Sequence, residues 1–372
     1  MSVTAATLLA LVIAALALAF ANGANDNAKG VATLIGARRL GRRAAVLYAT
    51  AATFLGSAAA LLLGTGLLAR FSGKGILAGD LVDTPAFALS VAAAAAGTVL
   101  LATRLGLPVS TTHALVGGLA GVGWASGTLQ GAALAAAFLG PLLLSPLIAL
   151  SATALAYPLL RRLRLALGVT HESCVCVATE HPVPSADGGA VAIRRGGLHI
   201  VHDEARRCAG YAGTVAGIDA QRALDGCHLV TAGAVSFARG VNDAPKIAAL
   251  LLVAAPLGLG GGPSLLLVAL AMAAGGLLAA RRVATTMSHR ITAMNDGQAF
   301  TANLATAGLV LLASRFGVPV STTHVSVGAL FGIGAVSCSA RWRTIAAIVL
   351  SWVAILPLAA LLAAGAWLLV GS

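Results

Sequence analysis

The feature that most constrains this chain is a series of apolar runs long enough to cross a lipid bilayer. The first run, LLALVIAALALAFA at 8–21, contains no charged residue, and comparable runs recur to the end of the sequence. A bilayer core needs roughly 20 apolar residues in helical form. Only 10% of the residues are charged, whereas soluble proteins carry about 25%, so we exclude a soluble enzyme. The runs also lack the apolar–polar alternation of membrane β-strands.

We therefore predict an all-α, polytopic membrane protein with about ten to twelve transmembrane segments. The hydrophobic segments are 4–36, 43–69, 84–103, 109–127, 130–158, 228–254, 263–280, 284–314, 319–338 and 344–370. The first is interrupted near 22–27 and the sixth near 239–243. Because several segments exceed the required length, we expect tilted, broken or re-entrant helices. We expect the first run to be a retained span, because the preceding MSVT lacks the basic residues of a signal peptide.

Basic residues are distributed unequally between alternate loops. If the odd-numbered loops face the cytoplasm, thirteen arginines lie on that side and three basic residues lie outside. The cytoplasmic set is Arg38, Arg39, Arg42, Arg43, Arg104, Arg161, Arg162, Arg164, Arg281, Arg282, Arg290, Arg341 and Arg343, and the external set is Arg70, Lys74 and Arg315. Positive residues favour the cytoplasmic side, which predicts a multi-pass inner (plasma) membrane protein with both termini outside. This bias explains most of the net charge of +12 without a nucleic acid partner.

The two halves of the chain contain related sequences. The segments ATRLGLPVSTTHALVGGLAGVG (102–123) and ASRFGVPVSTTHVSVGALFGIG (313–334) are identical at 14 of 22 positions. An N-D-x-x-K element precedes each copy, with 87 residues between Asp26 and His113 and 81 between Asp243 and His324. The chain therefore contains an internal duplication.

Each half has five apparent spans, and an odd number forces the second copy to insert upside down. We predict an N-terminal membrane repeat at 1–158, a cytoplasmic loop or small domain at 159–227, and an inverted C-terminal repeat at 228–372. Inverted repeats with broken helices are typical of secondary transporters, whose binding site lies near the midplane. Duplication that served helix packing alone is the simpler alternative.

The N-D-x-x-K elements place Asn25, Asp26 and Lys29 in the first half and Asn242, Asp243 and Lys246 in the second, within apolar segments. Each aspartate and lysine are three residues apart, so they share a helix face and can pair. A charge at the bilayer centre costs about 2.5–3.5 kcal/mol on insertion scales. Two such pairs at equivalent positions indicate a binding function more than packing. Gly23, Gly240 and Pro245 suit helix breaks at these points.

The P-V-S-T-T-H elements predict helix starts, since proline is tolerated in a first turn and serine or threonine caps it. The hydroxyl residues are Ser110, Thr111 and Thr112 in the first copy and Ser321, Thr322 and Thr323 in the second. A helix N-terminus binds oxyanions, whereas an ordinary capped helix would need only one hydroxyl.

Four further residues are candidates for the pathway. His113 and His324 could relay protons or simply join helices by hydrogen bonds. Arg239, which occupies the position matching Asn22, could add positive charge to one side of the site. Asp296 could line the pathway or mark an interface.

Both elements resemble the signatures of the inorganic phosphate transporter (PiT) family of secondary carriers, a duplicated G-A-N-D-V-A-N-A with P-[VI]-S-T-T-H in each half. The resemblance covers 20–36, 100–123, 228–247 and 281–334. It implies a dimer that takes up phosphate with Na⁺ or H⁺ by alternating access. The residues that it carries over are Asn25, Asp26, Asn242, Asp243, Ser110 to Thr112 and Ser321 to Thr323. Because a sulfate-transporting branch exists, sulfate or another tetrahedral oxyanion is the alternative substrate.

Lys29 and Lys246 depart from the family signature, which has its second asparagine at these positions. An ammonium group can take the electrostatic role of a bound cation beside a carboxylate. We hypothesise that the lysines replace coupling Na⁺ or contact the anion, which favours H⁺ over Na⁺ as the coupling ion. Alternatively, each lysine only neutralises its aspartate.

The segment 159–227 contains four of the five cysteines and four of the eight histidines. Cys174 and Cys176 are weak metal candidates, because no second cysteine pair has the spacing of a zinc site. We expect reduced thiols and no metal, and a hairpin around Gly196–Gly197.

Two other classes of membrane protein fit the sequence less well. An anion channel usually builds its pore by subunit symmetry about the membrane normal. A membrane enzyme would need a nucleophile–base pair or metal spacing that the sequence lacks.

Overall fold

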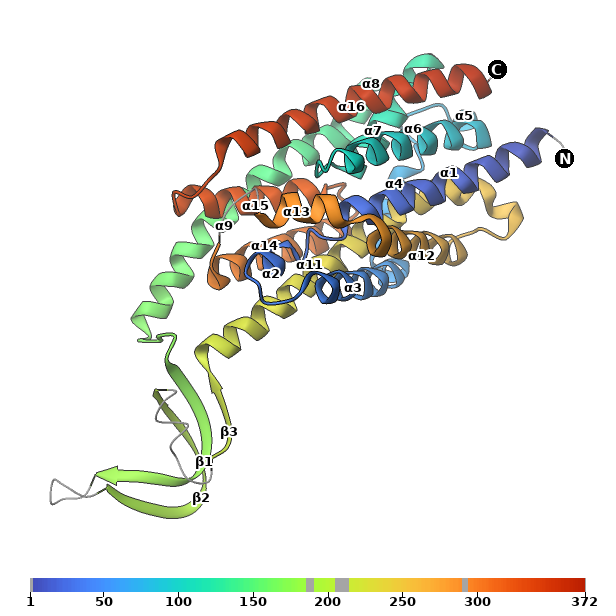
Figure 1. Cartoon of the computed structure of the whole chain (residues 1–372). Helices are drawn as coiled ribbons and strands as arrows, with labels where there is room; N and C mark the ends of the chain where they lie inside the picture. Colours follow the sequence, from blue (N-terminus) through green and yellow to red (C-terminus); the bar gives the residue numbers. More distant parts are fainter. Residues whose placement is uncertain (1–2, 185–190, 205–213, 290–293, 372) are drawn as a thin grey trace.

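The computed structural model describes residues 3–184, 191–204, 214–289 and 294–371. The helices form an elongated bundle, and a three-stranded sheet projects from one end of it (Figure 1). Both termini lie at the opposite end from the strands. The termini and the segment that joins the two repeats are thus separated by the length of the bundle, as an odd number of crossings per repeat requires.

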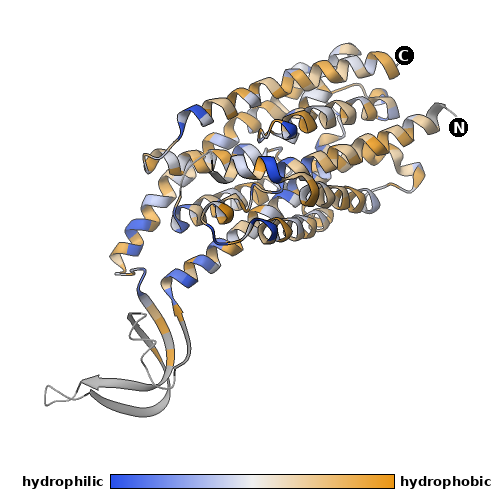
Figure 2. Ribbon diagram, in the orientation of Figure 1, coloured by the Kyte–Doolittle hydropathy of each residue, from blue (hydrophilic) through white to orange (hydrophobic). Residues whose placement is uncertain are grey.

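Within the described residues, seven helical segments are long and apolar enough to cross a membrane. They are α1 (Val3–Asp26), α3 (Arg42–Leu63), α6 (Pro85–Arg104), α8 (Gly131–Leu134) continued by the π-helix η1 (Ala135–Leu139) and α9 (Gly140–Ala166), α11 (Ala220–Ala248) continued by the 3-10 helix η2 (Ala249–Leu257), α12 (Gly262–Ala279) and α16 (Trp342–Val370). Hydrophobic residues dominate these helices, and hydrophilic residues gather near the centre of the bundle and at the end toward the strands (Figure 2).

The other described helices are α2 (Ala32–Gly36), α4 (Thr65–Phe71), α5 (Gly79–Val82), α7 (Thr111–Ala125), α13 (Arg281–His289), α14 (Asp296–Arg315) and α15 (Thr322–Val336). Every predicted apolar segment contains a helix, but the ten to twelve predicted spans exceed the seven that have the necessary length and composition. The helices α7 and α15 have 15 residues each. At 1.5 Å per residue each is about 22 Å long, which is shorter than the bilayer core.

Each of these short helices forms a hairpin with the helix before it, α6–α7 and α14–α15. The outer ends of a hairpin are the two ends away from its turn. In the first hairpin, the Gln130 amide just after α7 donates at 2.9 Å to the carbonyl of Ile76, which precedes α6, so the two outer ends lie together. The outer end of the second hairpin lies beside the start of α11, where Gln221 donates to Asp296 at 3.1 Å. The hairpins therefore enter the bundle from opposite ends (Figure 1). A re-entrant hairpin removes two crossings from each half, so the number of crossings stays odd.

Arg104 and Arg315 lie at the ends of α6 and α14 that precede the hairpin turns. The Arg104 carbonyl accepts from Arg282, which belongs to the same predicted cytoplasmic set, at 2.6 Å, and the assignment of both residues to loops stays a prediction. The other basic residues that were assigned to loops lie outside the hairpin turns. Arg290 is outside the described residues.

Helix packing follows the internal repeat. Helix α1 packs on α6 and α12, while its counterpart α11 packs on α14 and α3, and α7 packs on α16 as α15 packs on α9. Gly23 and Gly240 allow the close approaches: a Cβ on Gly23 would meet the Met272 carbonyl oxygen at 2.0 Å, and one on Gly240 would meet that of Thr53 at 2.2 Å. The two glycines thus serve helix contact, as small residues do in membranes, and do not mark breaks.

The segment between the repeats is not all-α. Strands β1 (Ser173–Pro184), β2 (Val191–Glu204) and β3 (Thr214–Asp219) form an antiparallel sheet in the order β2-β1-β3. The predicted turn at Gly196–Gly197 is wrong, because β2 continues through both glycines. They lie where the β1–β2 register shifts, opposite the stretch between Ala178 and Glu180, and glycine commonly occupies such irregular positions.

Candidate substrate site

The two N-D-x-x-K elements lie in differently shaped backbones. Helix α1 ends at Asp26, and Lys29 lies in the turn before α2. In the second repeat, α11 continues through Asp243 and Lys246 and changes to 3-10 geometry only at Ala249. The predicted interruption near 22–27 is thus a few residues early, and the one near 239–243 is wrong. Proline at 245 does not break α11, since membrane helices tolerate the loss of a single amide donor.

The P-V-S-T-T-H elements form the inner tips of the hairpins, as capped helix starts. The Ser110 hydroxyl accepts from the His113 amide at 3.1 Å, and the Ser321 hydroxyl accepts from the His324 amide at 3.3 Å. One hydroxyl per copy therefore caps its helix, and the two threonines that follow are available for other contacts. The N-termini of α7 and α15 meet in the centre of the bundle.

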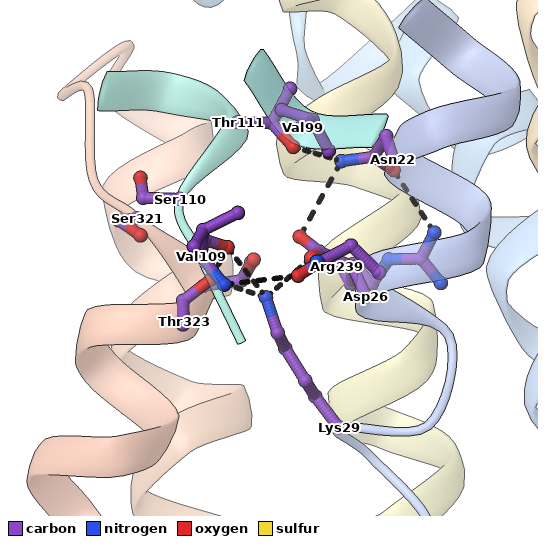
Figure 3. A network of polar contacts seen from close by, with 12 residues as sticks. Asn22, Asp26, Lys29, Val99, Val109, Ser110, Thr111, Arg239, Ser321 and Thr323 are labelled. Atoms are coloured by element: carbon purple, nitrogen blue, oxygen red, sulfur yellow. Dashed lines mark hydrogen bonds and ion pairs between the residues drawn. The ribbon is translucent and has the colours of Figure 1, made fainter. Parts of the chain in front are cut away.

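The Lys29 ammonium lies where the two repeats meet (Figure 3). It pairs with the Asp26 carboxylate and donates to the Thr323 hydroxyl and to the Val109 carbonyl, the last at 3.1 Å. Thr323 in turn donates to the Val109 carbonyl at 2.7 Å. Three oxygens, from a carboxylate, a hydroxyl and a hairpin carbonyl, therefore surround this ammonium group.

Lys246 has the equivalent contacts with the repeats exchanged. Its ammonium donates to the Val320 carbonyl at 2.6 Å and to the Thr112 hydroxyl at 2.8 Å, and it lies 3.6 Å from the Asp243 carboxylate. Each lysine thus joins an acidic helix to both hairpin tips. The sequence symmetry extends to individual hydrogen bonds.

Asn22 and Arg239 connect the two acidic groups, and Figure 3 shows both side chains beside Asp26. The Asn22 amide donates to Thr111 at 3.0 Å and to Asp243 at 3.2 Å, and lies 3.4 Å from Asp26. Arg239 donates to the Asn22 carbonyl oxygen at 3.0 Å and lies 3.9 Å from Asp243. The sequence motifs do not include Asn22, although its alignment with Arg239 could have indicated it.

Asn25 and Asn242 hold the hairpin turns in place. The Asn25 side chain donates to Leu107 at 2.9 Å and to Thr103 at 3.0 Å, and accepts from the Val109 amide at 3.0 Å. Asn242 accepts from Ser314, the counterpart of Thr103, at 3.2 Å. Both amides therefore contact the inner ends of the hairpins.

Among the described residues, the buried lysine, arginine and aspartate side chains are Lys29, Arg239, Lys246, Asp26 and Asp243, each at most 3% exposed. Three cations face two carboxylates, which leaves one positive charge at two helix N-termini. Since each such charge is costly within a membrane, this excess indicates a site for an anion.

The remaining candidates occupy different places. The His113 and His324 rings lie 4.3 Å apart between the hairpins, and His113 contacts the Ser110 hydroxyl at 2.9 Å. Thr322 contacts Asp243 at 3.4 Å. Asp296 lies at the outer end of α14, where Arg39 donates to it at 3.2 Å, so it is not at the centre. This hydrogen bond lowers the pKa of the Asp296 carboxyl.

The thiol candidates lie in the sheet. Cys174 is buried on β1, and nothing of the Cys176 side chain falls within the described residues. No cluster of three metal-ligating side chains is found in the part of the chain that the structure describes.

A cavity of about 240 Å³ leads away from the site on one side. Lys29 lines it at the site, and Met294 and Arg341, which lie next to the outer end of the α14–α15 hairpin, line it further out. On the other side, the Phe71 ring lies 5.6 Å from the Lys246 ammonium and stacks edge-on against Phe138. The site is thus reached from one end and covered toward the other.

Inverted repeats, re-entrant hairpins that meet at their tips, and a buried charged site together define a multi-pass membrane transporter. The chain matches the phosphate transporter family over residues 22–363 and belongs to that family. It is a transporter and not an enzyme.

The sequences or structures of the following known proteins are similar to almost the whole chain. A relative from Thermococcus kodakarensis that is named as a phosphate permease is 29% identical over 397 residues, covering 96% of each chain. The chloroplastic inorganic phosphate transporter 2-1 of Arabidopsis thaliana is 30% identical, over 92% of this chain and 68% of its own. The solved structure of a sodium-dependent phosphate transporter has the same fold, with a TM-score of 0.76, 23% identity, and coverage of 98% and 99%.

Proposed function

We propose that this protein carries inorganic phosphate across the cytoplasmic membrane, by alternating access at the site between the hairpin tips. The observation that supports this most is the single uncompensated positive charge at the meeting N-termini of α7 and α15. Helix N-termini favour oxyanions through their free amides and their dipoles. The names of the relatives given above point to the same substrate.

We propose further that Lys29 and Lys246 occupy the positions of coupling cations. The three oxygens around Lys29 belong to the chemical types that bind hard cations in carriers, namely carboxylate, hydroxyl and backbone carbonyl at an unwound helix. The solved relative is named as sodium-dependent, whereas in this chain an ammonium fills each position. Transport is therefore independent of Na⁺ and coupled to H⁺.

The cavity beside Lys29 and the Phe71 ring beside Lys246 correspond to one state of the transport cycle, open toward the end that carries the sheet. The arginine bias of the loops makes this end cytoplasmic, so the state is inward-facing and both termini are external. The functional unit is a homodimer in the inner membrane.

Uptake of radiolabelled phosphate into proteoliposomes tests the substrate. We expect saturable uptake that a tenfold excess of unlabelled phosphate abolishes and the same excess of sulfate does not. Asp26→Asn and Asp243→Asn should each abolish uptake, because each leaves a buried lysine without its carboxylate. Stronger competition by sulfate would identify the protein as a sulfate carrier, and normal uptake by both variants would contradict the site.

A further inference from the structure

A groove lies between the start of α3 and the end of α12, outside the substrate site. Its volume is about 930 Å³, and three arginines, Arg42, Arg43 and Arg281, lie among its lining residues. Leu47, Leu277 and Leu278 also line it and are 60%, 48% and 79% exposed. We refer to this feature, defined by these six residues, as the α3–α12 groove.

The groove has its charges and its apolar surface at different depths. Helix α3 begins at Arg42, and Arg281 lies just after the end of α12, and both helices are long and apolar enough to span a membrane. The arginines are therefore at the level of lipid headgroups. Leu47 and Leu277 are five and four residues further into their helices, or about 6–8 Å deeper, where acyl chains begin.

The charged residues that line the groove are all basic. Among the residues that the structure describes, no carboxylate forms an ion pair with Arg42, Arg43 or Arg281. Two sequence regions more than two hundred residues apart thus bring three exposed guanidinium groups to one opening. One guanidinium group can bind two phosphate oxygens at once, and basic pockets between membrane helices bind anionic headgroups.

We propose that the α3–α12 groove binds an anionic phospholipid, with the headgroup phosphate at the three arginines and one acyl chain along the three leucines. The groove is a lipid site and is separate from the site for the transported anion.

One side chain connects this groove to the substrate site. Asn27 donates to the Val46 carbonyl at 3.4 Å, and a Cβ on Gly276 would meet its amide carbon at 2.7 Å. Val46 and Gly276 both line the groove. On its other side Asn27 accepts from Arg239 at 3.2 Å. A lipid that holds α3 against α12 therefore stabilises the position of Arg239.

Native mass spectrometry of the full chain, after incubation with phosphatidylglycerol or phosphatidylcholine, tests this proposal. The groove variant combines Arg42→Gln, Arg43→Gln and Arg281→Gln. The matched control combines Arg161→Gln, Arg162→Gln and Arg164→Gln at the end of α9, which changes the charge equally outside the groove. A third variant, Leu277→Trp, fills the apolar part and keeps the arginines.

We expect the wild type and the α9 control to retain phosphatidylglycerol in preference to phosphatidylcholine. The groove variant should bind phosphatidylglycerol at least roughly tenfold more weakly, and Leu277→Trp should also lose binding. If the groove variant does not fold, Leu277→Trp decides the test alone. Unchanged binding in the folded variants, equal loss in the α9 control, or a change from dimer to monomer without loss of lipid would overturn the proposal. Because binding is read from mass, the result does not depend on which anion is transported.

Discussion

At the scale of single residues, the distinctive feature is that each buried lysine has three oxygen partners drawn from both repeats. Lys29 contacts Asp26, Val109 and Thr323, and the contacts of Lys246 repeat this arrangement. An ammonium group has three N–H donors, so Lys29 can satisfy every donor without water. Such a group can hold the hairpin tips together as a coupling cation would, but it cannot dissociate.

Lys29→Asn, which restores the residue of the family signature, should make transport depend on Na⁺. The change leaves Asp26, Val109 and Thr323 without a cation, and loss of one partner from a buried pair costs about 3–5 kcal/mol. We expect uptake without Na⁺ to fall at least roughly tenfold, in keeping with this cost, and to recover in part as Na⁺ is added. The measurement is phosphate uptake over a Na⁺ titration.

Lys74→Asn is the matched control, because Lys74 is exposed and, among the residues that the structure describes, its ion pair is with the exposed Asp83 at 3.3 Å. It should leave uptake and its lack of Na⁺ response unchanged. Wild-type uptake by Lys29→Asn in the absence of Na⁺ would show that this lysine has no role in coupling.

At the scale of elements, the hairpins decide the geometry of the site, and their inner turns are attached to the acidic helices. Asn25 joins α1 to the turn after α6 through Thr103, Leu107 and Val109. The N-terminus of α7 is thereby held at a fixed position relative to Asp26.

Thr103→Val should lower uptake, whereas Thr98→Val on the same helix should not. The Thr103 hydroxyl accepts from Asn25. Within the described part of the chain, the Thr98 hydroxyl makes one hydrogen bond, which it donates to the carbonyl of Ala94 in its own helix at 2.7 Å. Removing the acceptor leaves the buried Asn25 amide with one fewer partner, at a cost of about 1–3 kcal/mol. We expect a lower unfolding temperature and at least roughly fivefold slower uptake for Thr103→Val. Equal behaviour of the two variants would contradict the attachment of the hairpin.

The sequence predicted those parts of the fold that depend on local hydrophobic pattern or on the free-energy cost of placing a charge in the membrane. The apolar segments, the duplication and the buried Asp–Lys pairs were all visible, because charges within apolar runs are costly wherever they pack. Re-entrant helices were expected, but the α6–α7 and α14–α15 pairs were interpreted as ordinary spans, since a helix of 15 residues and a short span have the same hydropathy. The roles of Gly23 and Asn25 depend on which helix packs opposite, and no local pattern contains that information.

At the scale of the whole molecule, the site is accessible from one end and covered by Phe71 and Phe138 toward the other. The two repeats are alike in sequence but differ in conformation, since α1 unwinds beside Lys29 while α11 continues past Lys246. A conformational exchange of these two environments would move the opening from one side to the other.

Ser326→Cys, in a background where the five cysteines are replaced by serine, tests this asymmetry. Ser326 lines the open cavity, and its counterpart Leu115 is buried in the hydrophobic core. A membrane-impermeant thiol reagent should modify Ser326→Cys from the cytoplasmic side, and phosphate should slow the reaction. Leu115→Cys should not react from that side. Modification of Ser326→Cys from the external side only would show that the cavity opens to the outside, and would contradict the proposed orientation.

The central claim is that two lysines take the place of dissociable coupling cations. Phosphate uptake by the wild-type protein in proteoliposomes, with Na⁺ replaced by choline and the proton gradient set independently, tests it most directly. We predict undiminished uptake without Na⁺, and loss of accumulation when the proton gradient is collapsed. Uptake that fails without Na⁺ but persists without a proton gradient would contradict it.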